Sequence, residues 1–112
     1  MAGKFEIFKD KAGEFRFRLK SGNGETVLTS EGYSKKASAV NGVESVKKNA
    51  GDAANFDKSE TDGGGFRFAL KAKNRQIIGT SQTYKTASGR DNGVGAVGRA
   101  ADGANVVDLS DA

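Results

Sequence analysis

Hydrophobic and basic residues alternate in one short segment, and the same alternation returns further along the chain. Phe15, Phe17 and Leu19 are separated by arginines, and residues 66–71 repeat the pattern with one alanine in place of an arginine. A period of two predicts a β-strand with one buried and one hydrated face. We therefore predict two such strands, with their phenylalanines turned toward one common face and their basic side chains toward solvent.

Comparison of the sequence with itself shows that this recurrence is extensive. At an offset of 51 residues, residues 15–50 align without a gap with residues 66–101, and 14 of the 36 positions are identical. Two copies are too few for a solenoid, so a paired unit with pseudo-two-fold symmetry is predicted. We assign repeat 1 to residues 10–58 and repeat 2 to residues 61–109, within a single domain formed by residues 1–112.

Each repeat continues with a turn and a second strand. Residues 21–24 contain Asn-Gly, which tolerates the positive φ of a tight hairpin, and strands are expected at 25–30 and 76–81. Apolar residues stand side by side in these two strands, so the direction of their side chains is not fixed by alternation. Val27 and Ile78 are expected to face inward because both are bulky.

The spacing of apolar residues then becomes helical. One helix is predicted to begin after Ser34 as its N-cap and to end before Gly51, which takes the C′ position. The second helix is predicted over residues 86–101 and contains four interior glycines. Each interior glycine costs about 1 kcal/mol relative to alanine, so packing must hold this helix in place.

Short strands are also predicted at residues 5–8, 55–58 and 105–109, which gives the order strand, then twice strand–strand–helix–strand. We predict an α+β fold in which both helices pack on one apolar face of a single sheet. The phenylalanines are expected on that face alone. Five of them are predicted to share one core: Phe5, Phe15, Phe17, Phe66 and Phe68.

The doubled pattern Phe-Arg-Phe-x-Leu-Lys, Asn, Thr-Ser-x-x-Tyr and Asn-Gly-Val-x-x-Val resembles the YegP-like family of small bacterial tandem-repeat proteins. The resemblance covers about residues 4–109. It implies two tandem repeats that share one β-sheet and exchange their C-terminal strands. It implies no catalytic residue, cofactor or ligand, because the family has no established biochemical function.

The composition excludes several kinds of active site. The chain contains no cysteine and no histidine, so it has no disulfide, thiolate nucleophile, zinc–thiolate site or Ser-His-Asp triad. Residues 93–98 match the dinucleotide motif G-x-G-x-x-G, but they fall within a predicted helix rather than at a strand-to-helix turn. We therefore predict a protein that is not an enzyme and that holds no cofactor or metal.

Charge is distributed unevenly and suggests a binding surface. Residues 15–50 carry a net charge of +4, residues 66–101 carry +6, and the rest of the chain carries −6. The leading interpretation is a non-catalytic binding or scaffold domain whose partner meets a cationic sheet face. The partner itself is not identified, and an acidic protein or a nucleic acid would both fit the charge. The candidate binding residues on that face are Arg16, Arg18, Lys20, Arg67 and Lys71.

Two other functions stay open. Weak, salt-sensitive nucleic-acid binding is the first alternative, although inward-facing aromatics leave no rings for base stacking. In that case, reversing the charges of Arg16, Arg18 and Arg67 should abolish binding at little cost to folding. The second alternative is a small-molecule-binding protein or enzyme with a polar pocket near Tyr33 and Tyr84.

Three pairs of matched polar residues invite a structural or a functional interpretation. For Asn41-Gly42 and Asn92-Gly93, the structural interpretation is that each glycine lets the helix approach the sheet closely, while the asparagine side chain hydrogen-bonds to a nearby backbone group. The functional interpretation is a polar site that the repeat has duplicated. Tyr33 and Tyr84, grouped with Ser30 and Ser81, leave the same two interpretations open. We expect each tyrosine to pack at a strand-to-helix corner with its own hydroxyl satisfied.

No targeting or membrane segment is recognised. The start of the chain lacks an apolar segment, residue 2 is alanine, and no apolar run approaches the ~20 residues of a membrane helix. A cytoplasmic protein is expected. Because the two repeats can complete one sheet within the chain, we also expect a monomer, with edge-to-edge dimerisation as the alternative.

Overall fold

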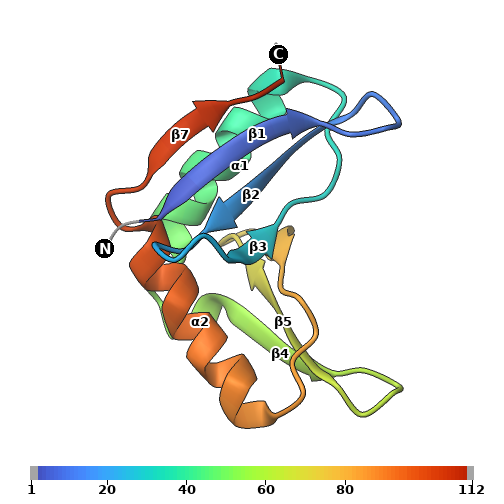
Figure 1. Ribbon diagram of the computed structural model, residues 1–112, viewed down its shortest axis with the longest axis vertical. Coiled ribbons are helices and arrows are strands. Elements are labelled where there is room, and N and C mark those ends of the chain that lie inside the picture. Colours follow the sequence, from blue (N-terminus) through green and yellow to red (C-terminus); the bar gives the residue numbers. More distant parts are fainter. Residues whose placement is uncertain (1–2, 111–112) are drawn as a thin grey trace.

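The computed structural model describes residues 3–110, and Figure 1 shows two helices lying against one sheet. The sheet has seven strands in the order β4-β5-β6-β3-β2-β1-β7. A mixed α+β fold with a single sheet and two helices is thereby confirmed. The elements in chain order are β1 (Lys4–Lys9), β2 (Phe15–Lys20), β3 (Thr26–Thr29), α1 (Lys36–Asn49), a 3₁₀ turn (Ala53–Asn55), β4 (Phe56–Glu60), β5 (Phe66–Lys71), β6 (Ile77–Thr80), α2 (Ala87–Ala101) and β7 (Asn105–Asp108).

The order of the strands links the two halves of the chain. Antiparallel strands β1, β2 and β3 form one half of the sheet, and β4, β5 and β6 form the other. The halves meet where Thr29 of β3 lies opposite Thr80 of β6. The strand that follows each helix does not join the strands that precede that helix. Strand β4, which follows α1, lies beside β5, and β7, which follows α2, runs parallel to β1 at the opposite edge of the sheet (Figure 1).

Register shifts explain the adjacent apolar residues of β3 and β6. The pairing of β2 with β3 shifts between Leu19 and Lys20, as a β-bulge does, and Val27 is the extra residue in β3. Val27 and Leu28 are consequently both buried, although they are consecutive. The inward orientation of Val27 and Ile78 is confirmed, since each is only 5% exposed.

Leu28 and Gly79 complement each other at the junction between the two halves. The two residues occupy the same position in their repeats, 51 residues apart. A Cβ atom built on Gly79 would lie 2.8 Å from Leu28 Cγ, closer than side-chain atoms pack. The glycine therefore makes room for the leucine of the other repeat.

A single core of phenylalanine rings lies between the sheet and the helices. Phe5, Phe17 and Phe68 are fully buried in one hydrophobic cluster. Phe5 meets Phe17 edge-to-face with ring centroids 6.0 Å apart, and Phe56 meets Phe68 in the same way at 5.5 Å. Such pairs add about 0.5–1.5 kcal/mol to the gain from burial alone.

Two of the predicted core rings are less enclosed. Phe15 is half-buried and packs against the margin of the core. The prediction for Phe66 is wrong, because this half-buried ring lies outside the core cluster and beneath the Arg90 guanidinium, 5.3 Å from its centre. Phe66 is the first residue of β5, where the first turn of α2 supplies an arginine instead of an apolar side chain.

Each helix approaches the sheet at a glycine. A Cβ atom at Gly42 would lie 2.6 Å from Cε2 of Phe17, and one at Gly93 would lie 2.4 Å from the Tyr84 hydroxyl. Close approach at these glycines is thus confirmed. The accompanying prediction for the asparagines is wrong: Asn41 and Asn92 are exposed, and their side chains make no hydrogen bond to any described residue.

The starts of the two helices differ. The first helix has Lys35 as its N-cap, with no side-chain hydrogen bond, so the prediction that Ser34 caps it is wrong by one residue. In the second helix, the Thr86 hydroxyl accepts a hydrogen bond of 2.9 Å from the backbone N–H of Gly89. Between residues 3 and 110, neither helix is long and apolar enough to cross a membrane.

Glycine-to-alanine substitutions in the helices separate packing from helix propensity. Gly42→Ala is expected to lower the free energy of unfolding by about 2 kcal/mol, because the new methyl overlaps the immobile Phe17 ring. Gly95→Ala is the control, since its methyl would meet only the flexible end of Arg99; it should raise stability by up to about 1 kcal/mol. Urea denaturation measures both, and equal effects of the two substitutions would contradict the close approach.

Candidate binding surface on the open face of the sheet

The outer face of the sheet is the face turned away from both helices. Alternation along each strand, together with the strand register, defines its members. All five predicted binding residues belong to it. The outer face comprises Lys4, Glu6, Phe8, Arg16, Arg18, Lys20, Thr26, Thr29, Asp57, Ser59, Arg67, Ala69, Lys71, Ile77, Thr80, Asn105 and Val107.

A buried carboxylate organises the β1–β2 part of the outer face. Glu6 is only 6% exposed, and its Oε1 accepts a hydrogen bond of 2.7 Å from Nε of Arg18. The ammonium groups of Lys20 and Lys4 lie 3.3 and 3.4 Å from the same carboxylate. The hydrogen bond from Arg18 lowers the pKa of Glu6, against the opposing effect of burial. Glu6 thus holds three cations in fixed positions.

Phe8 also lies on the outer face. It follows Glu6 by two residues in β1, so strand alternation turns both side chains outward. The Arg18 guanidinium covers the half-buried ring, 4.6 Å from its centroid, as a cation–π contact. The prediction that every phenylalanine faces inward is therefore wrong for Phe8.

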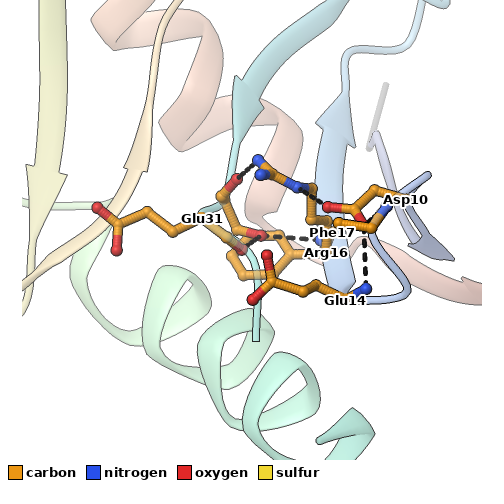
Figure 2. Close-up of polar contacts among 7 residues, drawn as sticks. Asp10, Glu14, Arg16, Phe17 and Glu31 are labelled. Atoms are coloured by element: carbon orange, nitrogen blue, oxygen red, sulfur yellow. Dashed lines mark hydrogen bonds and ion pairs between the residues drawn. The ribbon is translucent and has the colours of Figure 1, made fainter. Parts of the chain in front are cut away.

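Arg16 joins the β1–β2 turn to the end of β3, as Figure 2 shows. Its Nε donates to Asp10 Oδ2 at 2.6 Å, and its Nη1 donates to the Ser30 carbonyl at 3.2 Å. The other oxygen of Asp10 accepts the backbone N–H groups of Ala12 and Glu14, each at 2.9 Å. These donors, with Arg16 first, lower the pKa of Asp10.

The serines beside the tyrosine corners have structural roles. Ser30 Oγ accepts the backbone N–H of Phe17 at 2.9 Å and donates to the Glu31 carbonyl at 2.8 Å (Figure 2). Ser81 repeats this arrangement with the backbone of Phe68 and Gln82. The expected packing of Tyr33 and Tyr84 against the core is confirmed. Neither phenol hydroxyl forms a hydrogen bond with a described residue, so the prediction that these hydroxyls are satisfied is wrong.

The β4–β5 part of the outer face is less tightly paired. Lys71 contacts Asp57 at 3.1 Å, an ion pair in which the aspartate side chain is 61% exposed. Arg67 occupies the position of Arg16, but Thr61 replaces the aspartate that Arg16 binds. Arg67 forms no ion pair with any residue in the described part of the chain and is exposed.

Arginines 16 and 18 are therefore structural as well as cationic. Substituting glutamate for Arg18 would place a second carboxylate beside buried Glu6, and the same change at Arg16 would oppose Asp10. We therefore expect the joint reversal of Arg16, Arg18 and Arg67 to destabilise the fold, in contrast to the little cost expected from the sequence. Of the three, Arg67 alone has no ion-pair partner within residues 3–110.

The other candidate site was a polar pocket near the tyrosines. A groove of about 600 Å³ lies beside Tyr84 and Asn92, between α2 and the β2–β3 turn. At Tyr33, burial and the neighbouring Glu31 raise the pKa of the phenol. Within residues 3–110, no three acidic side chains cluster as a metal site would require.

Comparison with known proteins places the chain in a family. The family described as "Domain of unknown function (DUF1508)" matches residues 10–57 and again residues 62–108. The chain belongs to this family. Two DUF1508 matches in succession fit a tandem arrangement, and the resemblance to YegP-like proteins is confirmed.

Relatives of known sequence and structure agree with this assignment. The chain is 51% identical to a UPF0339 protein of Stutzerimonas stutzeri, over 97% of this chain and 98% of the relative. It is 50% identical to the UPF0339 protein YegP of Escherichia coli K12, over 87% of this chain and 88% of YegP. The solution structure of E. coli YegP, at 45% identity, matches with a TM-score of 0.94 over 100% of this chain and 97% of YegP. The names of these relatives state no catalytic activity and no nucleic-acid ligand.

Neutralising Glu6 tests the organisation of the outer face. Glu6→Gln should lower the free energy of unfolding by about 2 kcal/mol at pH 7, because three cations lose a buried partner. The folded-state pKa of Glu6 lies below its ordinary value of 4.5. Its stabilisation is therefore complete above that value and is lost as the pH falls through the folded-state pKa.

Asp57→Asn is the matched control, because Asp57 occupies the position of Glu6 in the other repeat but is exposed. Its effect should stay below about 0.5 kcal/mol. Urea denaturation at neutral and acid pH measures both variants. Equal losses, or a Glu6→Gln loss that persists in acid, would show that Glu6 does not organise this surface.

Proposed function

We propose that this DUF1508 protein is a non-catalytic binding or scaffold domain that recognises an acidic protein partner through the outer face. The observation that carries the proposal is an excess of positive charge on a sheet face that no helix covers. The six cations are Lys4, Arg16, Arg18, Lys20, Arg67 and Lys71, and the three carboxylates among them are Glu6, Asp10 and Asp57. The difference, +3, accounts for most of the net charge of +4 of the whole chain.

Two features suit this surface to protein binding. Ion pairs and hydrogen bonds hold Arg16 and Arg18 in place, so less side-chain entropy is lost when a partner binds. Short side chains cross the centre of the outer face, where Thr29, Ala69 and Thr80 come from neighbouring strands. A partner can therefore approach the middle of the sheet closely while its carboxylates meet cations on both sides.

Nucleic acid is the less suitable partner for this surface. Sheets that bind single-stranded nucleic acid stack bases on exposed aromatic rings. Phe8 is the aromatic ring on the described outer face, and Arg18 covers it. Glu6 and Asp10 would also repel phosphates next to the cations that they hold.

The proposal includes a particular architecture. We regard the chain as one domain of two repeats, residues 10–58 and 61–109, that share a sheet and exchange their C-terminal strands. The position of β4 beside β5, and of β7 beside β1, supports this arrangement. It gives one continuous outer face per chain, and a cytoplasmic monomer is sufficient to present it.

The monomeric state can be checked directly. Light scattering at micromolar concentration should give the chain mass of 11.7 kDa. The β4 edge is protected by charged Asp57, Lys58 and Glu60, whereas β7 exposes Val106 and Val107. A mass of twice that value, restored to the monomer by Val107→Lys, would show that β7 joins two copies.

Affinity capture followed by mass spectrometry tests the outer face as a binding surface. Nuclease-treated lysate should yield acidic proteins with the unaltered chain, and Arg67→Glu combined with Lys71→Glu should reduce their recovery about tenfold. These two residues are chosen because Arg67 is unpaired among described residues and the Lys71 pair is exposed. The stability of the double variant is measured alongside.

Lys48→Glu is the matched control, since it reverses an exposed charge on α1, on the opposite side of the sheet. Recovery with this variant should equal that with the unaltered chain. Loss of all capture after nuclease treatment would indicate a nucleic-acid ligand instead. Unchanged recovery with the double variant would show that the outer face is only a solvated surface.

A further inference from the structure

A second candidate site lies on the helix side of the molecule, apart from the outer face. The groove of about 600 Å³ beside Tyr84 has α2 as one wall and the β2–β3 turn, residues 21–25, as the other. In Figure 1 this turn lies next to the C-terminal half of α2. The groove therefore forms where repeat 1 meets the helix of repeat 2, and its volume falls in the usual range of ligand sites.

Small residues on one face of α2 leave the groove open. The groove-lining residues Gly89, Gly93, Ala96 and Ala100 follow one another at helical spacing. The equivalent positions of α1 are Ser38, Gly42, Ser45 and Asn49. Asn49 is buried and donates a hydrogen bond of 2.8 Å to the Ser45 carbonyl, so larger side chains occupy the corresponding face of α1.

Packing does not require all of these small residues. Gly93 is needed, because a Cβ atom there would overlap Tyr84. At Gly89 a Cβ atom would lie 3.1 Å from the Thr86 hydroxyl and otherwise meet only ordinary contacts. Gly89 lies in the first turn of α2, where packing does not require a glycine, and its missing side chain widens the groove.

Polar residues line both walls of the groove, and most of them are exposed. Glu25 comes from the turn, Gln82 and Tyr84 precede α2, and Asn92 and Arg99 project from α2. None of these five side chains forms an ion pair or a side-chain hydrogen bond with another described residue. The groove therefore offers one carboxylate, one guanidinium and two amides, above apolar lining from Val27, Ala96 and Ala100.

We propose that this groove binds a short peptide with free ends. The peptide carboxylate would meet the Arg99 guanidinium, and its ammonium group would meet Glu25 on the opposite wall. The side-chain amides of Asn92 and Gln82 each carry a hydrogen-bond donor and an acceptor. They can therefore bind the carbonyl and the N–H of a peptide group that lies between the two ends of the ligand. Small apolar side chains of the peptide would rest on Ala96.

NMR titration of the ¹⁵N-labelled chain with trialanine tests the proposal. Trialanine should shift the resonances of residues 21–25 and 89–100 and the side-chain amides of Gln82 and Asn92. The same peptide blocked by N-acetylation and C-amidation should bind at least about tenfold more weakly, because it lacks both charges. No shift at about 10 mM trialanine, or equal binding of the blocked peptide, would overturn the proposal.

Matched variants then locate the site. Arg99→Gln should weaken trialanine binding about tenfold, whereas Lys48→Gln, at the equivalent position of α1, should leave it unchanged. Both side chains are exposed, so both variants should fold. Gly89→Ser, which introduces the α1 residue, should also weaken binding. Equal effects of Arg99→Gln and Lys48→Gln would overturn the proposal, and none of these changes alters the outer face.

Discussion

The close approach of each helix to the sheet, at a glycine, is the constraint on which the rest of the structure depends. Gly42 allows α1 to pack directly against the Phe17 ring, and Gly93 allows α2 to pack directly against Tyr84 and Phe68. Because the helices lie so close, a few phenylalanine rings and small aliphatic side chains fill the space beneath them. Leu28 and Gly79 then complete this core where the two halves of the sheet meet.

Placing both helices on one side leaves the other side of seven strands without cover. That face is in contact with water, and its charged side chains make it hydrophilic. Glu6 and Asp10 hold the arginines of β2, whereas Arg67 in the other half is unpaired among described residues. The outer face consequently combines arginines held by carboxylates with one exposed arginine that is unpaired among described residues, and this spread of charge suits an extended acidic partner better than a small ligand.

Much of the fold could be predicted because hydrophobic periods and the internal repeat report directly on secondary structure. The five candidate binding residues were placed on one face for the same reason. Their carboxylate partners were missed, although a hairpin turning at residues 10–14 puts Glu6 opposite Arg18, and that register could have been drawn from the sequence. The groove beside α2 could not be predicted, because its walls come from different repeats and no sequence period relates them.

Mistaken predictions share a physical cause, namely contacts across the chain that local patterns do not contain. Phe66 has the sequence context of a core residue, yet Arg90 covers it because of where α2 begins. Leu28 and Gly79 occupy matching positions in the two repeats, and only their contact at the β3–β6 junction shows that they complement each other. Asn41 and Asn92 were expected to bond backbone, but α1 and α2 turn both toward solvent.

Chemical-shift mapping with a simple acidic polymer is the most direct test of the outer face as the binding surface. Poly-glutamate added to the ¹⁵N-labelled chain should shift the amides of β1, β2 and β5 and leave those of α1 and α2 unchanged. Poly-lysine should shift none of the strand amides. Shifts concentrated on the helices, or no shifts at all with poly-glutamate, would contradict the assignment of binding to the open face of the sheet.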